Sequence, residues 1–140
     1  MADLPPESLA QHSKLFSLLD DGGKKRLVSV AVEEEFAQGT AVVTEGQFGD
    51  AFFLVVSGSL SVRIGGTDAT REVAKLGPGA FFGEIAALLG EARSATVVCA
   101  TSTRALRFDA PRVQGILKDY PKIREVLVKL GLKRSEENLQ

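Results

Sequence analysis

Closely spaced glycines divide the middle of this chain into segments too short for ordinary helices. Between residues 32 and 108, stretches rich in Val, Phe, Thr and Ile are interrupted by Gly39, Gly46, Gly49, Gly58, Gly65, Gly66, Gly77, Gly79, Gly83 and Gly90. Glycine adopts the left-handed backbone conformations that tight turns need, so this spacing is typical of short strands joined by turns. Residues 60–64 alternate apolar and polar side chains, and residues 95–99 are almost wholly apolar, as expected for a half-buried and a more fully buried strand. The stretch therefore predicts a β-barrel or β-roll.

Helical patterns flank this β-rich stretch on both sides. Apolar residues recur close to a helical period over residues 7–19, and a second short helix is expected at roughly 23–31. Asp109 followed by Pro111 is typical of a helix start and predicts a helix over 110–118, and Pro121 opens a last helix at roughly 121–134. The predicted fold class is α+β, in one domain over residues 1–140. Its parts are N-terminal helices at about 7–31, an antiparallel, jelly-roll-like β-roll at about 32–108 and C-terminal helices at about 109–134.

Composition argues against several classes of protein. With 44% hydrophobic residues in 140, the chain can build a core, and its net charge of -1 gives no overall attraction to nucleic acid or to an anionic membrane. The longest apolar runs, such as residues 51–56, are far shorter than a membrane span, and the first residues lack a secretion signal. The single Cys99 cannot form an intrachain disulfide, so we expect a cytoplasmic protein. With one cysteine and one histidine, His12, a zinc site or a Cys–His dyad is not expected either.

Residues 79–97 combine a glycine–acid pair, a short apolar helix and an arginine in one excursion between strands. Gly83 is predicted to open a helix, which leaves the backbone N–H groups of Glu84, Ile85 and Ala86 unpaired and attractive to an anion. After a turn at Gly90, Arg93 could return to the same helix start and offer its planar guanidinium to a phosphate. Two more residues would add backbone donors there, Ser94 and Ala95, the first with its hydroxyl as well.

Glu84 would be repelled by a bound phosphate, so its expected task is to accept a hydrogen bond from a sugar hydroxyl. Together these residues predict a site for a small phosphorylated ribose. A simpler interpretation is that Glu84 and Arg93 form only a surface ion pair. No paired carboxylates, metal-ligand cluster or activated nucleophile accompany the segment, so we predict a protein that is not an enzyme and that uses no metal or cofactor.

The segment FGEIAALLGEARSATV closely resembles the phosphate-binding cassette of cyclic nucleotide-binding domains, the family of the bacterial catabolite activator and of protein kinase A regulatory subunits. The resemblance covers roughly residues 15–132. Along that length, ten residues match similar residues at the corresponding positions of that family's β-roll: Phe36, Gly39, Gly46, Asp50, Phe53, Gly58, Leu76, Gly79, Phe82 and Leu106.

The resemblance implies a role for each residue of the cassette. It implies that Glu84 binds the ribose 2′-hydroxyl and that Arg93 pairs with the cyclic phosphate. Backbone contacts would come from Gly83, Ile85 and Ala86, and the phosphate cradle would be completed by Ser94 and Ala95. In this family the last helix closes over the base as a lid, which makes four residues lid candidates here: Leu127, Leu130, Leu132 and Arg134.

These implications predict a sensor that relays ligand binding through movement of its terminal helices. Members of the family that prefer cyclic GMP often carry threonine at the position of Ser94, so the resemblance favours cyclic AMP over cyclic GMP. We expect a downstream protein partner or an effector domain, and no nucleic acid or membrane as partner. The sequence leaves open a homodimer formed through the terminal helices. It also leaves open a β-roll that binds no ligand and serves as a protein–protein interaction module.

Overall fold

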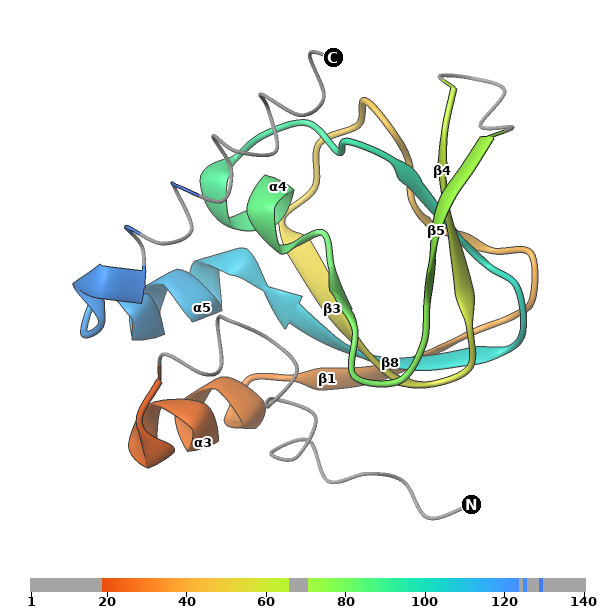
Figure 1. The fold of residues 1–140 in the computed structure, drawn as a ribbon. Helices are drawn as coiled ribbons and strands as arrows, with labels where there is room; N and C mark the ends of the chain where they lie inside the picture. The colour runs from red at the N-terminus through yellow and green to blue at the C-terminus, as the bar shows by residue number, and fades with distance from the viewer. Residues whose placement is uncertain (1–18, 66–70, 124, 126–128, 130–140) are drawn as a thin grey trace.

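The computed structural model describes residues 19–65, 71–123, 125 and 129, which form a β-roll of two four-stranded antiparallel sheets (Figure 1). One sheet contains, in spatial order, β1 (Val32–Phe36), β8 (Thr103–Asp109), β3 (Ala51–Ser57) and β6 (Phe81–Phe82). The other contains β2 (Ala41–Val43), β7 (Thr96–Cys99), β4 (Leu60–Ile64) and β5 (Arg71–Leu76). Three helices accompany the sheets in the described residues between 19 and 120, namely α3 (Asp21–Ser29), α4 (Glu84–Leu89) and α5 (Ala110–Leu117), and further helical residues begin at Pro121. The predicted fold class is confirmed.

Strand β3 is buried on both faces, which explains its unbroken apolar run. Phe53 and Val55 point toward the second sheet and pack in the cluster between the two sheets. Phe52 and Leu54 point the other way, into a cluster that side chains of α3, α4 and α5 cover. Because side chains alternate along a strand, only a continuous apolar run can serve two cores at once. The helices are thereby held against the outer face of the first sheet.

The structure differs from the sequence predictions in the position of α3 and in the cap of α5. Helix α3 begins at Asp21 rather than near residue 23, because Asp20 Oδ1 accepts a hydrogen bond from the Gly23 backbone N–H at 2.7 Å and so caps the helix. Helix α5 follows Asp109 as predicted, but the Asp109 carboxylate does not cap it. One of its oxygens instead lies 3.5 Å from Arg107 Nε. Residues 121–123 are helical, and no helix of the described residues is long and apolar enough to cross a membrane.

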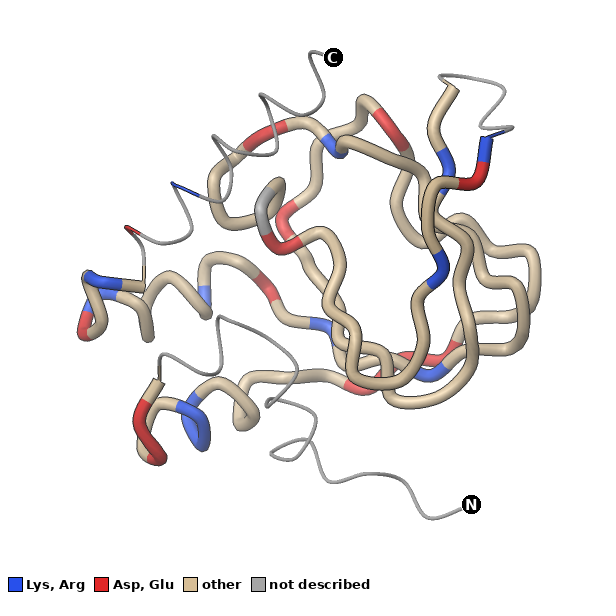
Figure 2. The backbone as a smooth tube through the Cα atoms, in the orientation of Figure 1, with Lys and Arg blue, Asp and Glu red and all other residues tan. Residues whose placement is uncertain are grey.

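Opposite charges are interspersed along the described chain (Figure 2). Across the β1–β8 pair, Arg104 forms an ion pair with Glu33, and Arg107 forms one with Glu34. Neighbouring charges of opposite sign cancel beyond a few ångströms, so the surface offers an anion no general attraction. Any anion site on this protein must therefore be built locally.

The turn between β3 and β4 requires glycine for space as well as for conformation. Gly58 has φ +97°, and a Cβ atom there would lie 2.5 Å from the Ser102 carbonyl oxygen. We expect Gly58→Ala to lower the free energy of unfolding by about 2–3 kcal/mol, from backbone strain plus overpacking. Gly39→Ala is the control, because Gly39 has φ +88° and nothing within 4 Å of the added atom. Urea unfolding of the two variants should separate them, and equal losses would contradict the steric argument.

Candidate ligand-binding site

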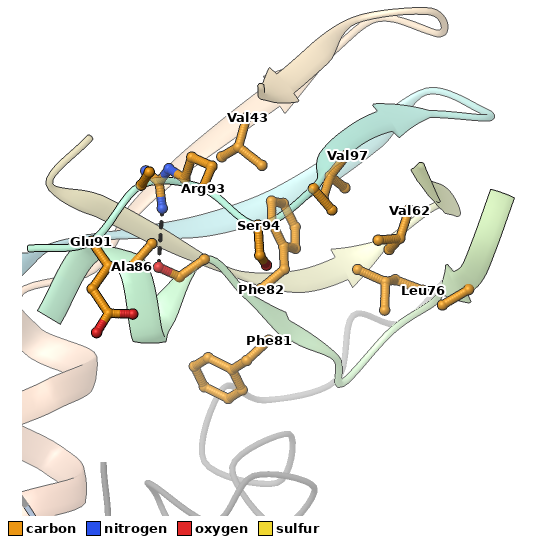
Figure 3. A pocket seen from close by; sticks show the side chains of 14 residues that line it. Val43, Val62, Leu76, Phe81, Phe82, Ala86, Glu91, Arg93, Ser94 and Val97 are labelled. Carbon is orange, nitrogen blue, oxygen red and sulfur yellow. Dashed lines mark hydrogen bonds between the residues drawn. The ribbon is translucent and has the colours of Figure 1, made fainter. Parts of the chain in front are cut away.

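A cavity of about 400 Å³ opens where the start of α4, the loop at residues 91–95 and the inner face of the second sheet meet (Figure 3). This volume lies in the range of small-molecule sites. The residues that line it come from strands β2, β4, β5, β6 and β7 as well as from α4 and the loop. The cavity therefore depends on segments that lie more than 50 residues apart in the sequence.

Gly83 sets the direction of the chain at the mouth of α4. Its φ of +82° places it in the left-handed region, and it directly precedes Glu84, the first residue of the helix. The Ala87 N–H donates to the Gly83 carbonyl at 3.0 Å, which closes the first helical turn. The backbone N–H groups of Glu84, Ile85 and Ala86 come before this first bond and, as in any helix start, take no part in the hydrogen bonds of the helix backbone. A left-handed glycine thus directs the chain from β6 into α4, and Gly83 and Ala86 both line the cavity.

The Arg93 guanidinium is almost fully buried at the wall of the cavity, with 7% of the residue exposed. Its Nη1 donates to the Gly83 carbonyl at 3.0 Å, as the dashed line in Figure 3 marks, and its Nη2 donates to the Ala51 carbonyl at 2.7 Å. Burial lowers the pKa of Arg93 below its ordinary value, and the negative charge of Asp50 partly offsets this. A guanidinium has five N–H donors, so these two bonds leave further donors for an anion.

Two glycines provide the space that the guanidinium occupies. A Cβ atom at Gly49 would lie 2.6 Å from Arg93 Nη2, and one at Gly83 would lie 2.7 Å from Nη1. The backbone of Arg93 is fixed as well, because its N–H donates to the Gln47 carbonyl and its carbonyl accepts from the Gly46 N–H, both at 2.8 Å. The turn at residues 46–50 and the loop that carries Arg93 therefore form one unit.

Sequence reasoning missed the contributions of Gln47, Gly49 and Ala51 to this site. Gln47 and Ala51 act through backbone carbonyls, which any residue carries, so their side chains gave no signal. Gly49 was visible only as one glycine among many. The cluster of turn residues from Gly46 to Asp50 was the one feature that could have indicated a close backbone approach.

The structure brings most of the predicted site residues to the cavity. Five of them line it, namely Gly83, Ala86, Arg93, Ser94 and Ala95. Glu84 does not line it; this residue is partly buried in the first turn of α4. The backbone of Ile85 belongs to α4, and its side chain lies outside what the structure describes. The lid candidates Leu127, Leu130, Leu132 and Arg134 also lie outside the described residues.

Residues 33–120 match the model of the cyclic nucleotide-binding domain family. The chain is 42% identical over 96 residues to a cyclic nucleotide-gated potassium channel of Mesorhizobium japonicum, a match that covers 69% of this chain and 25% of the channel. The chain thus spans about a quarter of the length of that relative.

Solved structures show the same fold. The regulatory domain of Toxoplasma gondii PKA, crystallised with cAMP, superposes with a TM-score of 0.75 at 28% identity, covering 82% of this chain and 44% of that one. A PKAR CBD2 bound to Sp-2Cl-cAMPS superposes with a TM-score of 0.76 at 19% identity, covering 95% and 86% of the two chains. The family model matches well over half of the sequence and includes the whole cavity, so the chain belongs to the cyclic nucleotide-binding domain family.

Proposed function

We propose that this protein is a sensor that binds cyclic AMP in preference to cyclic GMP in the cavity beside α4. The observation that carries the proposal is the buried cation at the cavity wall. Arg93 donates to two uncharged carbonyl groups, and burial disfavours its charge, an effect that the negative charge of Asp50 offsets only in part. A buried charge is stabilised most effectively by an opposite charge with hydrogen bonds, and a cyclic phosphate supplies both.

The other site residues fit the remaining parts of a cyclic nucleotide. The amides at the start of α4 and the exposed Ser94 beside Arg93 would bind phosphate oxygens. Glu84, the first residue of α4, would accept a hydrogen bond from the ribose 2′-hydroxyl, although its side chain does not line the cavity. The base would occupy the rest of the cavity. In this proposal the protein binds and releases its ligand without chemical change.

A series of contacts leads from the cavity to the terminal helices and supports a relay of ligand binding. Gln114 Nε2 of α5 donates to the Leu88 carbonyl of α4 at 2.9 Å. Past the end of α5, the Tyr120 hydroxyl donates to Asp20 Oδ1 at 2.7 Å. Movement of α4 would therefore displace α5 and, through the bond from Tyr120 to Asp20, the start of α3. We propose that an effector domain or a partner protein reads this displacement.

The first experiment is thermal unfolding of the protein with cyclic AMP, cyclic GMP and 5′-AMP, followed by calorimetry. A ligand that binds the native state raises the unfolding temperature by mass action. We expect both cyclic nucleotides to stabilise the protein and 5′-AMP to have little effect. Absence of any shift at millimolar ligand would favour the alternative, a β-roll that acts as an interaction module. Appearance of linear AMP during incubation with cyclic AMP would contradict the proposal that no reaction is catalysed.

Glu84 provides a test of the sugar contact. We expect Glu84→Gln to weaken cyclic AMP binding by about tenfold, because a neutral amide accepts a weaker hydrogen bond than a carboxylate does. The same substitution should have much less effect on 2′-deoxy cyclic AMP, which lacks the hydroxyl, and calorimetry with both ligands measures the difference. Equal losses for the two ligands would show that Glu84 does not contact the 2′-hydroxyl.

A further inference from the structure

Two charged side chains of opposite sign line the cavity within the described residues, Arg93 and Glu91. Both belong to the loop after α4, and Figure 3 shows them on the same side of the cavity. Arg93 is buried, whereas Glu91 is exposed to solvent. A phosphate bound at Arg93 would therefore lie near a negative charge that belongs to the same wall. None of the contacts proposed above uses this charge.

The backbone keeps Glu91 close to Arg93. Because one residue separates them, their Cα atoms lie no more than about 7 Å apart. The Glu91 N–H donates to the Ala86 carbonyl at 2.9 Å, which fixes this residue at the end of α4. The Arg93 N–H is fixed in turn by the Gln47 carbonyl. The Glu91 carboxylate therefore lies on the order of 10 Å from a phosphate at Arg93, about the Debye length in 0.1 M salt, so its charge still acts on the ligand.

Cyclic and linear nucleotides differ in charge. A cyclic phosphate is a diester with one negative charge, whereas 5′-AMP is a monoester whose phosphate approaches a charge of about −2 above its second pKa of about 6. The Coulomb energy of two charges is proportional to their product. Arg93 by itself would therefore attract 5′-AMP more strongly than cyclic AMP. A negative charge beside the same site opposes that preference.

Glu91 supplies such a charge. Its carboxylate repels a dianion twice as strongly as a monoanion at the same position. Since free energies are logarithmic in the dissociation constant, the factor by which Glu91 weakens 5′-AMP binding is the square of the factor for cyclic AMP. Each charge adds its own Coulomb term, so this relation holds whichever other groups contact the nucleotide.

We propose that Glu91 is a specificity-determining residue, whose carboxylate makes the site at Arg93 favour monoanionic cyclic nucleotides over dianionic linear ones. It acts through its charge rather than through a hydrogen bond to the ligand. The inference rests on the proposed function and deepens it, because it names ligand charge as a property that the site selects.

Glu91→Gln tests the inference, because it removes the charge with little change in size and leaves the backbone bond to Ala86 in place. Displacement of a fluorescent cyclic AMP analogue at pH 8 in low salt gives the dissociation constants of adenosine, cyclic AMP and 5′-AMP. We expect no change for adenosine, a gain of about twofold for cyclic AMP and a gain of about fourfold for 5′-AMP. Both gains should shrink in about 1 M salt, where the Debye length is about 3 Å.

Two further variants sharpen the test. Glu91→Lys reverses the charge and should square the gains, to about fourfold for cyclic AMP and about sixteenfold for 5′-AMP. Glu35→Gln is the matched control, since 80% of the Glu35 side chain is exposed on β1, the edge of the first sheet farthest from β6. Residues of β6 line the cavity, so this control should leave all three dissociation constants unchanged.

The outcomes separate this inference from the proposed function. Equal gains for cyclic AMP and 5′-AMP, a gain for adenosine, or no gain for 5′-AMP in Glu91→Lys would overturn selection by charge. In each case cyclic AMP would still bind, and the proposed function would stand. Equal effects of Glu91→Gln and Glu35→Gln would show that only the net charge of the protein matters. Failure of cyclic AMP to bind the unchanged protein would overturn the proposed function and the role of Glu91 together.

Discussion

Replacing Arg93 with alanine is expected to weaken cyclic AMP binding by about tenfold to hundredfold. A hydrogen bond to a charged group contributes about 1.5–3 kcal/mol, and each 1.4 kcal/mol changes a dissociation constant tenfold. The amides at the start of α4 would still attract the phosphate, so weak binding should remain. Calorimetric titration with cyclic AMP, carried to saturation, gives the dissociation constants of both proteins.

Two controls separate the loss of a ligand contact from damage to the fold. Arg93 also donates to the Gly83 and Ala51 carbonyls, so the alanine variant must be unfolded without ligand to measure its stability. Arg112→Ala removes the same charge from an exposed residue of α5 and should leave the affinity unchanged. Arg93→Lys keeps the positive charge but lacks the planar guanidinium that reaches two acceptors. The affinity of this variant for cyclic AMP should therefore lie between that of Arg93→Ala and that of the unchanged protein. Unchanged affinity in Arg93→Ala would exclude this residue from the ligand site.

Phe108→Ala is expected to lower the free energy of unfolding by about 3–5 kcal/mol, the range for removing a buried aromatic ring. Phe108 of β8 and Phe52 of β3 are both fully buried, and their rings stack with centroids 5.0 Å apart. Phe81 packs against both rings from β6. Three strands and the helices above them would therefore border the space left by the ring. The change should shift the urea midpoint without altering the slope of the transition.

The exposed Phe48 supplies the matched control for this loss. Phe48 is 74% exposed in the turn beside Arg93. Phe48→Ala should therefore change the free energy of unfolding by less than about 0.5 kcal/mol. A loss in Phe108→Ala no larger than that of Phe48→Ala would contradict the placement of Phe108 in the core that holds the helices.

The sequence predicted the strands and turns well because their signals are local. Gly46, Gly58, Gly79 and Gly83 all have positive φ, a conformation that glycine adopts without strain and that other residues rarely adopt. The limits of α4 are local as well. Gly83 and Gly90 are both left-handed, and they enclose the six residues of the helix. The start of α3 was placed two residues late because a pair of aspartates can serve a turn or a cap, and only the Asp20 hydrogen bond decides between them.

The sequence by itself determined the short strands and turns between residues 32 and 108 and the short helix between Gly83 and Gly90, because each depends on neighbouring residues. Only the tertiary structure decided that Arg93 is buried against the carbonyl of Ala51, 42 positions away, in space that Gly49 provides. It also decided that Val62, Ala74 and Leu76 face the cavity while the polar residues of the same strands face outward. The reason is physical: such contacts are fixed by strand pairing and by the packing of one sheet on the other, and neither is specified by residues adjacent in sequence.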